Sequence, residues 1–296
     1  MNSKITIIIP LGERKSLEAL ETIKQQKEKV NFIIERGPNP SLNRNNGIKK
    51  AKTEIIAFIN GHTLLPQNWS RNIRIFFEKY KEIDVVGGPQ LTPKNSSYFE
   101  KISGYALSSK FGSGGVSGRY NGKRLMMNAN ETMLTSANIA CRKKVVKKIK
   151  FDEKLYPGED PKFISDAKKF GFNVAFEPNI FVYHRRRTDI KNFFIQNFNY
   201  GKVRPKKEPF SETIKHPFFI IPSLFVLYLI LLIPLMIISK FFLFPLIGYI
   251  CLSILFSVYE GTKNNDFFAI FSLPFIFLTI HLSYGAGFLY GLLFKK

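Results

Sequence analysis

The chain has 296 residues, of which 45% are hydrophobic, and a formal net charge of +22. The charge is uneven: Met1 to His216 carries 40 basic and 20 acidic residues, whereas only six charged side chains lie from Pro217 onward. This division excludes one evenly mixed soluble domain and predicts a basic polar part followed by an apolar part.

The charge and the cysteines exclude further classes of protein. The basic residues are dispersed and no recognition motif accompanies them, so we expect no nucleic-acid partner. Positive charge beside apolar segments favours contact with anionic lipid headgroups and also suits phosphorylated substrates. Cys141 and Cys251 fall one in each part, which suits a reducing compartment and excludes a disulfide framework.

The first half of the polar part predicts strands alternating with helices. The run Ile5–Pro10 is too short and too early for a signal peptide, so we interpret it as a first strand. Alternation of this kind predicts a doubly wound α/β sheet with parallel pairing. The elements that follow are a helix from Ser16, its predicted N-cap, to Lys27, a strand at Asn31–Glu35, a helix at Leu42–Lys52, and strands at Ile55–Ile59 and Asp84–Gln90.

The second half begins with a glycine-rich stretch, Ser108 to Arg124, for which two interpretations stay open: a mobile loop over a site, or a plain linker. Ser136 to Val146 predicts a strand that passes into a helix. A helix is expected from Pro161 to Phe170. Two further strands are predicted, one around Asn173–Phe176 and one ending at His184.

The apolar part contains three segments long enough to cross a membrane: Pro217–Ser239, Phe241–Tyr259 and Phe267–Phe294. The alternative, helices buried in a large soluble core, lacks the polar sequence needed to cover such a core. Basic residues before the first segment anchor that end inside, but three crossings would put Lys295 and Lys296 outside, against the positive-inside rule. An interfacial or re-entrant segment would remove this conflict. Close helix packing is predicted at three glycines of the last segment: Gly285, Gly287 and Gly291.

Polar side chains gather at the predicted ends of strands. In an open α/β sheet, ligands bind beyond the carboxyl ends of the strands. Glu159 and Asp160 follow a Pro-Gly turn and begin a helix. The residues at or just past strand ends are Glu13, Glu35, Asn60, His62 and His184.

Several motifs, in order, resemble the family 2 nucleotide-sugar glycosyltransferases with a GT-A fold. The stretches "ITIIIP", "SLNRNNGIKKAKTEIIAFINGHTLLPQNW" and "TSANIACRKKVVKKIKFDEKLYPGEDPKF" resemble the opening strand, the metal-motif region and the acceptor-side segment of that family. The segments "NFFIQNFNYGKVR" and "LPFIFLTIHLSYGAGFLYGLL" are most similar to the membrane-bound subgroup typified by succinoglycan-biosynthesis glycosyltransferases. The resemblance implies a Rossmann-like nucleotide-diphospho-sugar transferase domain followed by transmembrane helices.

The resemblance also implies a site for the nucleotide-sugar. Pro10 and Glu13 match the loop that lines the nucleoside pocket, and Glu35 stands where an acidic residue contacts the base. Arg44 and Asn45 match the helix that borders the nucleotide. Carboxylates and amides suit this role because base edges and ribose hydroxyls offer hydrogen-bond donors. A surface salt bridge is the alternative role for Arg44.

The metal motif departs from the family. Asn60-Gly61-His62 falls on its Asp-x-Asp motif, so both aspartates are replaced. His62 and His184 are the implied metal ligands, with Asn60 near the ribose or the metal. Imidazole suits Mn²⁺, whereas Mg²⁺ prefers oxygen, so the expected cofactor is a divalent cation, Mn²⁺ or Mg²⁺, with metal dependence left open.

The reacting groups follow from the same resemblance. Asp160 matches the catalytic base of inverting transfer, and Glu159 shapes the acceptor side; helix N-capping is the alternative. Arg185 and Arg187 would bind the diphosphate leaving group by charge-assisted hydrogen bonds. A juxtamembrane basic cluster is the alternative for these arginines.

Together these features predict a cytoplasmic GT-A domain at residues 1–190, an interfacial segment at 191–216 and about three membrane helices at 217–296. The expected function is inverting transfer of a sugar from a nucleotide-diphosphate donor to a lipid-linked or polyprenyl-phosphate acceptor, at the membrane. The partners implied are the nucleotide-sugar, the lipid-linked acceptor and the membrane. The rival hypothesis is a non-catalytic binding subunit of a polysaccharide assembly complex, which Asn60 favours and the Glu159-Asp160 pair opposes.

Overall fold

A computed structural model describes residues 4–12, 17–207 and 213–294. The chain forms two compact units: unit 1 is Met1–Pro93 with Gly118–Arg185, and unit 2 is Lys94–Ser117 with Arg186–Lys296. This division differs from the expected one, because residues 94–117 join the C-terminal helices rather than the α/β domain. Each unit is described by itself.

Unit 1 contains a six-stranded sheet with the order β2-β1-β3-β7-β5-β8. Its strands are β1 (Ile5–Leu11), β2 (Asn31–Arg36), β3 (Ile55–Ile59), β5 (Val85–Gly87), β7 (Asn138–Arg142) and β8 (Val174–Phe176). Its helices are α1 (Ala19–Lys24), α2 (Pro40–Lys50), α3 (Trp69–Lys79), α6 (Gly118–Asn121), α7 (Lys143–Lys148) and α8 (Glu159–Lys169). The predicted cap Ser16 lies outside the described residues. The other expected strands and helices of the first half are confirmed, except that the predicted strand Asp84–Gln90 is divided in two.

Strand β7 corrects the expectation of purely parallel pairing. It runs antiparallel to β3 and to β5, and places Asn138 opposite Ile59. The alternation of strands and helices is interrupted before β7, because the chain leaves unit 1 after β6 and returns at Gly118. As a result, the amino end of β7 lies at the same sheet edge as the carboxyl ends of β1, β3 and β5.

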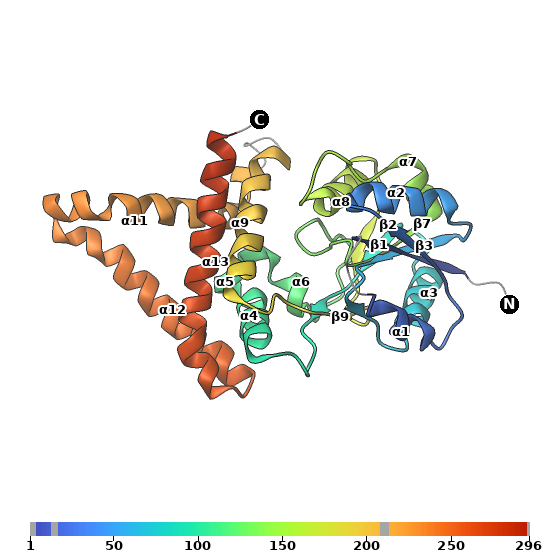
Figure 1. Ribbon diagram of the computed structural model, residues 1–296, viewed down its shortest axis with the longest axis horizontal. Helices are drawn as coiled ribbons and strands as arrows, with labels where there is room; N and C mark the ends of the chain where they lie inside the picture. Colours follow the sequence, from blue (N-terminus) through green and yellow to red (C-terminus); the bar gives the residue numbers. More distant parts are fainter. Residues whose placement is uncertain (1–3, 13–16, 208–212, 295–296) are drawn as a thin grey trace. The chain divides into compact units, whose positions relative to one another are not determined.

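The two faces of the sheet bury separate apolar layers. Side chains alternate between the faces of a strand, so Ile7 and Ile9 pack in one cluster while Ile8 packs in the other. The first cluster includes Trp69 and Ile73 of α3, and the second includes residues of α2, α7 and α8. Figure 1 shows α1 and α3 on one face, with α2, α7 and α8 on the other.

A second sheet, β4-β9-β6, lies at the carboxyl edge of the first. Its strands are β4 (Thr63–Leu64), β6 (Gln90–Leu91) and β9 (Val182–His184). The predicted strand Asp84–Gln90 is therefore two strands in different sheets, joined through Gly88. A side chain could not fit there, since a Cβ on Gly88 would lie 2.2 Å from the carbonyl oxygen of Ile180.

Asn138 joins the two sheets through four hydrogen bonds. The side chain is 1% exposed. Its Nδ2 donates to the carbonyl oxygens of Gly88 (3.0 Å), Pro89 (3.5 Å) and Ile180 (2.6 Å). Its Oδ1 accepts from Nε1 of Trp69 at 2.9 Å. One buried amide thus satisfies polar groups from α3, from the β5–β6 connection and from the segment before β9.

Unit 2 begins with helices, which overturns both interpretations of the glycine-rich stretch. Helix α4 (Tyr98–Ser108) is followed by α5 (Lys110–Ser113) and the short 3₁₀ helix η1 (Gly114–Val116). Ser109 caps α5 by accepting from the backbone N–H of Phe111. The Phe111 ring packs against Phe277 and Phe256 in an apolar cluster, so part of this stretch belongs to a core.

The remaining helices of unit 2 follow the predicted segments. Helix α9 covers Ile190–Lys207, η2 Pro217–Phe219 and η3 Lys240–Leu243; the long helices are α11 (Ile221–Ile238), α12 (Phe244–Lys263) and α13 (Phe267–Leu293). The last three are long and apolar enough to cross a membrane, as predicted. The candidate span that contains α12 also includes η3. The expected close packing is also confirmed, because a Cβ on Gly285, Gly287 or Gly291 would lie 2.0–2.3 Å from a backbone oxygen of a neighbouring segment.

The substitution Asn138→Ala tests the junction between the sheets. It leaves the Trp69 N–H and several carbonyl oxygens buried without a partner, at a cost of about 1–3 kcal/mol for each unsatisfied group. We expect a lower midpoint of chemical unfolding in detergent, followed by the fluorescence of Trp69, the single tryptophan. Asn95→Ala, at an exposed asparagine, is the matched control. Equal midpoints for the two variants would contradict this account.

Candidate functional site

Two histidines meet at the carboxyl edge of the sheet. His62 follows β3 in a turn, and His184 is the last residue of β9, where it pairs with Thr63 of β4. Their Nε2 atoms are 3.0 Å apart, and Nδ2 of Asn60 lies 3.4 Å from Nε2 of His184. The β4–β9 pairing therefore brings together three side chains that lie up to 124 positions apart in the sequence.

The two histidine nitrogens and the Asn60 amide suit a transition-metal ion better than Mg²⁺. Two nitrogens bound to one ion at right angles lie about 3 Å apart, given metal–nitrogen bonds near 2 Å. The amide of Asn60 offers an oxygen, and Mg²⁺ would require more oxygen ligands. Among the residues that the structure describes, no group of three or more His, Cys, Asp or Glu side chains could hold a metal. The described side chains thus fit an ion that takes its remaining ligands from a substrate or from water.

An ion pair borders the histidines. Nε of Arg185 lies 3.0 Å from a carboxylate oxygen of Glu18, and both side chains are about one-third exposed. The same region is fixed by the backbone, because the N–H of Ala19 donates to the carbonyl of Gly61 at 2.9 Å. Glu18 was missed by the sequence argument, although an acid at the start of the helix after the first strand is the signal that could have found it.

Asp160 lies in the first turn of α8, where its side chain bonds to the adjacent strand. Its Oδ2 accepts from the backbone N–H of Ser136 at 3.2 Å, just before β7. Gly158, with φ +116°, opens the helix and provides no side-chain cap. The Asp160 carboxylate is thus held near the start of β7, which pairs with β3, the strand that leads to Asn60. It does not cap its own helix, α8.

Glu159 and Arg44 form a buried ion pair. Nη1 of Arg44 lies 2.8 Å from Oε1 of Glu159, and the side chains are 4% and 5% exposed. Burial and the neighbouring charge of Asp160 raise the pKa of Glu159, against the opposing effect of Arg44. Arg44 does form a salt bridge, but the alternative of a surface salt bridge is wrong because the pair is buried. Removing one partner of such a pair costs about 3–5 kcal/mol, because the other charge stays buried.

Asn45 extends this connection between α2 and the segment before α8. Its side chain donates to the carbonyl of Phe151 and to Glu153 at 2.9 Å each, and accepts from the N–H of Phe151 at 3.0 Å. The guanidinium of Arg44 also lies 5.1 Å from the centre of the Phe151 ring. Both polar groups selected on α2 therefore form hydrogen bonds within unit 1, and their predicted place beside the nucleotide stays a prediction. Glu153 was not foreseen.

The structure describes three of the four other predicted residues. Pro10 and Glu35 are paired in β1 and β2, and Glu35 forms an ion pair with Lys50 at 2.7 Å. Arg187 is exposed at the start of unit 2. Glu13 lies outside the described residues. Their predicted roles in binding the nucleotide-sugar stay predictions.

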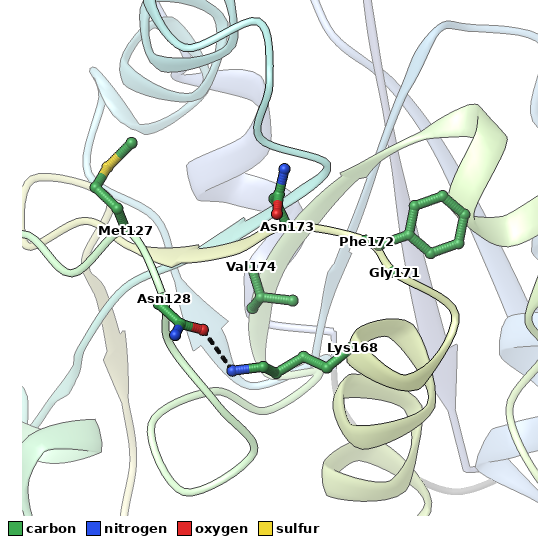
Figure 2. Close-up of a pocket in the computed structure, with 7 residues that line it drawn as sticks. All are labelled: Met127, Asn128, Lys168, Gly171, Phe172, Asn173 and Val174. Carbon is green, nitrogen blue, oxygen red and sulfur yellow. Dashed lines mark hydrogen bonds between the residues drawn. The ribbon is translucent and has the colours of Figure 1, made fainter.

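A surface pocket of about 410 Å³ lies elsewhere on unit 1. Figure 2 shows Lys168 reaching from α8 to Asn128, with Val174 at the beginning of β8 between them and the aromatic ring of Phe172 turned to one side. The pocket is therefore at the amino end of β8. It contains none of the selected residues, and we assign it no part in the chemistry.

Comparisons with known proteins agree with this geometry. Residues 11–150 match the family model described as Glycosyl transferase family 2. No curated protein sequence matches the chain.

Among solved structures, the mannosyltransferase PcManGT from Pyrobaculum calidifontis, in complex with GDP-Man and Mn²⁺, is similar with a TM-score of 0.58 and 10% identity, over 100% of this chain and 89% of that chain. TarS 1–349 from S. aureus, in complex with UDP, has a TM-score of 0.47 and 14% identity, over 66% of this chain. The alignment spans 63% of that TarS chain, which is less than two thirds of its length. The chain described here therefore resembles glycosyl transferase family 2 over residues 11–150 and has a GT-A-like fold, followed by three long apolar helices that are candidate membrane spans.

Proposed function

We propose that this protein is a membrane-bound inverting glycosyltransferase that moves a sugar from a nucleotide-diphosphate donor to a lipid-linked or polyprenyl-phosphate acceptor. The observation that carries the proposal is the meeting of Asn60, His62 and His184 at the carboxyl edge of the sheet, with Asp160 held at the start of the adjacent strand. The family match and the candidate membrane spans support it.

The histidines form the donor side of the proposed site. His62 and His184 would hold a divalent transition ion, which supplies positive charge to the diphosphate when it is bound. Asn60 adds an amide beside them. Arg185, oriented by its ion pair with Glu18, donates hydrogen bonds to the phosphate oxygens. Arg187 follows two residues later and would add a second guanidinium.

The nucleoside would extend along the first strands. Pro10, Glu13 and Glu35 are the proposed contacts there. Arg44 and Asn45 contribute differently in this proposal: their bonds to Glu159, Glu153 and Phe151 fix the segment that carries the acceptor side.

Asp160 forms the acceptor side. A carboxylate at this position takes the proton from the acceptor hydroxyl as the hydroxyl oxygen attacks the anomeric carbon, opposite the departing diphosphate. The hydrogen bond from the Ser136 backbone holds one carboxylate oxygen, which leaves the other available for the proton. Glu159, paired with Arg44, positions the adjacent backbone. A polyprenyl phosphate acceptor would arrive already ionised and would need this base less.

A non-catalytic binding subunit is the second candidate function. The observation that favours it is Asn60, a neutral side chain in place of the first aspartate of the metal motif. Such a protein would bind nucleotide-sugar and release no free nucleotide, whatever acceptor is supplied.

The substitution Asp160→Asn tests the base. Loss of a positioned base lowers turnover by about 10²–10⁴-fold, so we expect kcat to fall by this factor while KM for the nucleotide-sugar stays nearly constant. The measurement is transfer from a panel of nucleotide-sugars by purified full-length protein with membrane lipid extract. Asp166→Asn, on the same helix and paired with Lys162, is the control.

Three outcomes would change the proposal. A mild effect of Asp160→Asn would point to an ionised phosphate acceptor. No turnover of any donor would contradict the enzyme and favour the binding subunit. A fall of similar size in the Asp166→Asn control would show that the loss reflects damage to α8 rather than removal of the base.

Direct titration with Mn²⁺ tests the two histidines. We expect His62→Ala and His184→Ala each to weaken Mn²⁺ binding, measured by isothermal titration calorimetry with UDP and with GDP in separate runs. Binding should also weaken in acid, because a protonated imidazole is not a ligand. His216→Ala, in unit 2, is the matched control. Mn²⁺ affinity unchanged by either substitution, or activity unchanged by a chelator, would rule out the metal site.

A further inference from the structure

Helix α13 is lined along its length by helices that carry charged side chains. Its first half packs against α4: Ile102 and Ala106 lie in one apolar cluster with Leu273 and Phe277. The hydroxyl of Tyr98 on α4 also lies 3.1 Å from that of Ser272. Both helices belong to unit 2, so this packing is internal to one compact body.

The second half of α13 packs equally closely against α9. A Cβ on Gly287 would lie 2.0 Å from the carbonyl oxygen of Phe198, and one on Gly291 would lie 2.2 Å from that of Lys202. A step of four residues on one helix thus matches a step of four on the other, so α9 and α13 run in the same direction, side by side. Lys202 also places its Nζ 5.0 Å from the centre of the Tyr290 ring.

The charges on α4 and α9 determine how α13 can lie in a bilayer. If α13 crossed the membrane, its neighbours would lie at hydrocarbon depth, and each charged side chain near the centre would cost about 2.5–3.5 kcal/mol or more. The charged residues concerned are Glu100 and Lys101 on α4, and Lys191, Lys202, Arg204 and Lys206 on α9. At 27 residues, or about 40 Å, α13 is flanked by such residues from its first turns to its last.

Helices α11 and α12 are different. Only 11% of each most apolar window is buried within the protein, against 33% for α13. They contact α13 at two separated places, where Gly285 meets Pro222 and where Gly261 meets Ile270. Figure 1 shows them extending away from α13 and meeting at their far ends, where η3 and Lys240 lie. With 18 and 20 residues, each is about 27–30 Å long, close to the thickness of a hydrocarbon core.

We propose that α13 lies in the boundary between headgroups and acyl chains, that α11 and α12 alone of the three candidate spans among the described residues cross the bilayer, and that the start of α11 and the end of α13 are on one side. The exposed face of α13 contacts the lipid surface, as do the exposed apolar faces of α11 and α12. Phe268, Phe271 and Phe275 form that face and are 62–73% exposed. A helix with aromatic side chains on one flank and polar neighbours on another is typical of this boundary.

This arrangement accounts for the charges at both ends of the apolar part. Because α13 then ends on the side where α11 begins, the two lysines that follow it in the sequence no longer oppose the positive-inside rule. Lys240 lies alone on the opposite side. Among the described residues, no candidate span precedes Ile221. The inference does not depend on glycosyl transfer.

Cysteine labelling of the full-length protein tests the arrangement. The parent variant is Cys251→Ser; Cys141 can stay, because it is fully buried and burial raises the pKa of its thiol, which keeps it unreactive. Into this background we would place Lys101→Cys, Lys240→Cys, Phe294→Cys and Leu293→Cys singly. Each is exposed to a membrane-impermeant maleimide in sealed right-side-out and inverted vesicles, with detergent-opened vesicles defining full labelling.

We expect Cys at 101 and 294 to react from one face of the vesicle and Cys at 240 from the other, each at least tenfold faster than from its opposite face. Trp69 fluorescence reports whether each variant folds. If Phe294→Cys does not fold, Leu293→Cys repeats the test, because Leu293 is also highly exposed. The parent variant reports background, and native Cys251 within α12 should react only after detergent is added. Labelling at 294 or 293 from the face that labels 240, or from neither face, would overturn the proposal.

Discussion

The candidate site depends on the reversed direction of β7. An antiparallel strand between β3 and β5 begins where its neighbours end, so polar groups at its start join those that follow β3 and β5. The buried amide of Asn138 stabilises this junction, because its hydrogen bonds satisfy the Trp69 N–H and the buried carbonyl oxygens of Gly88 and Ile180. The Ser136 N–H, two residues earlier, is thereby placed to hold Asp160.

Polar contacts attach two helices to the loops at this edge of the sheet. The Arg44–Glu159 pair and the Asn45 bonds attach α2 to the segment that leads into α8, while the Glu18–Arg185 pair and the Ala19–Gly61 bond attach α1 to the turn that carries His62. The two connections fix opposite sides of the proposed site. The exposed pair contributes little to stability, about 0–1 kcal/mol, whereas the buried pair is costly to break.

The sequence predicted the elements well because their periodic patterns are local. Runs such as Ile5–Leu11 and Ile55–Ile59 are apolar enough to identify as buried strands without any tertiary information. The direction of β7 could not be predicted, since a strand of five residues has the same pattern in either direction. The helices around Phe111 were missed for a similar reason: glycines favour loops locally, whereas the packing of that ring against α12 and α13 is a tertiary contact that stabilises the helical form. Arg44 and Glu159 were both selected, but their mutual contact spans 115 positions and leaves no local signal.

The proximity of Glu159 and Asp160 has a consequence for how the site would handle protons. The charge of Asp160 disfavours ionisation of Glu159, and Arg44 opposes this effect. When Asp160 accepts a proton, the repulsion disappears and the ionised form of Glu159, with its bond to Arg44, becomes more stable. The ion pair thus tightens at the moment the neighbouring acid is neutralised.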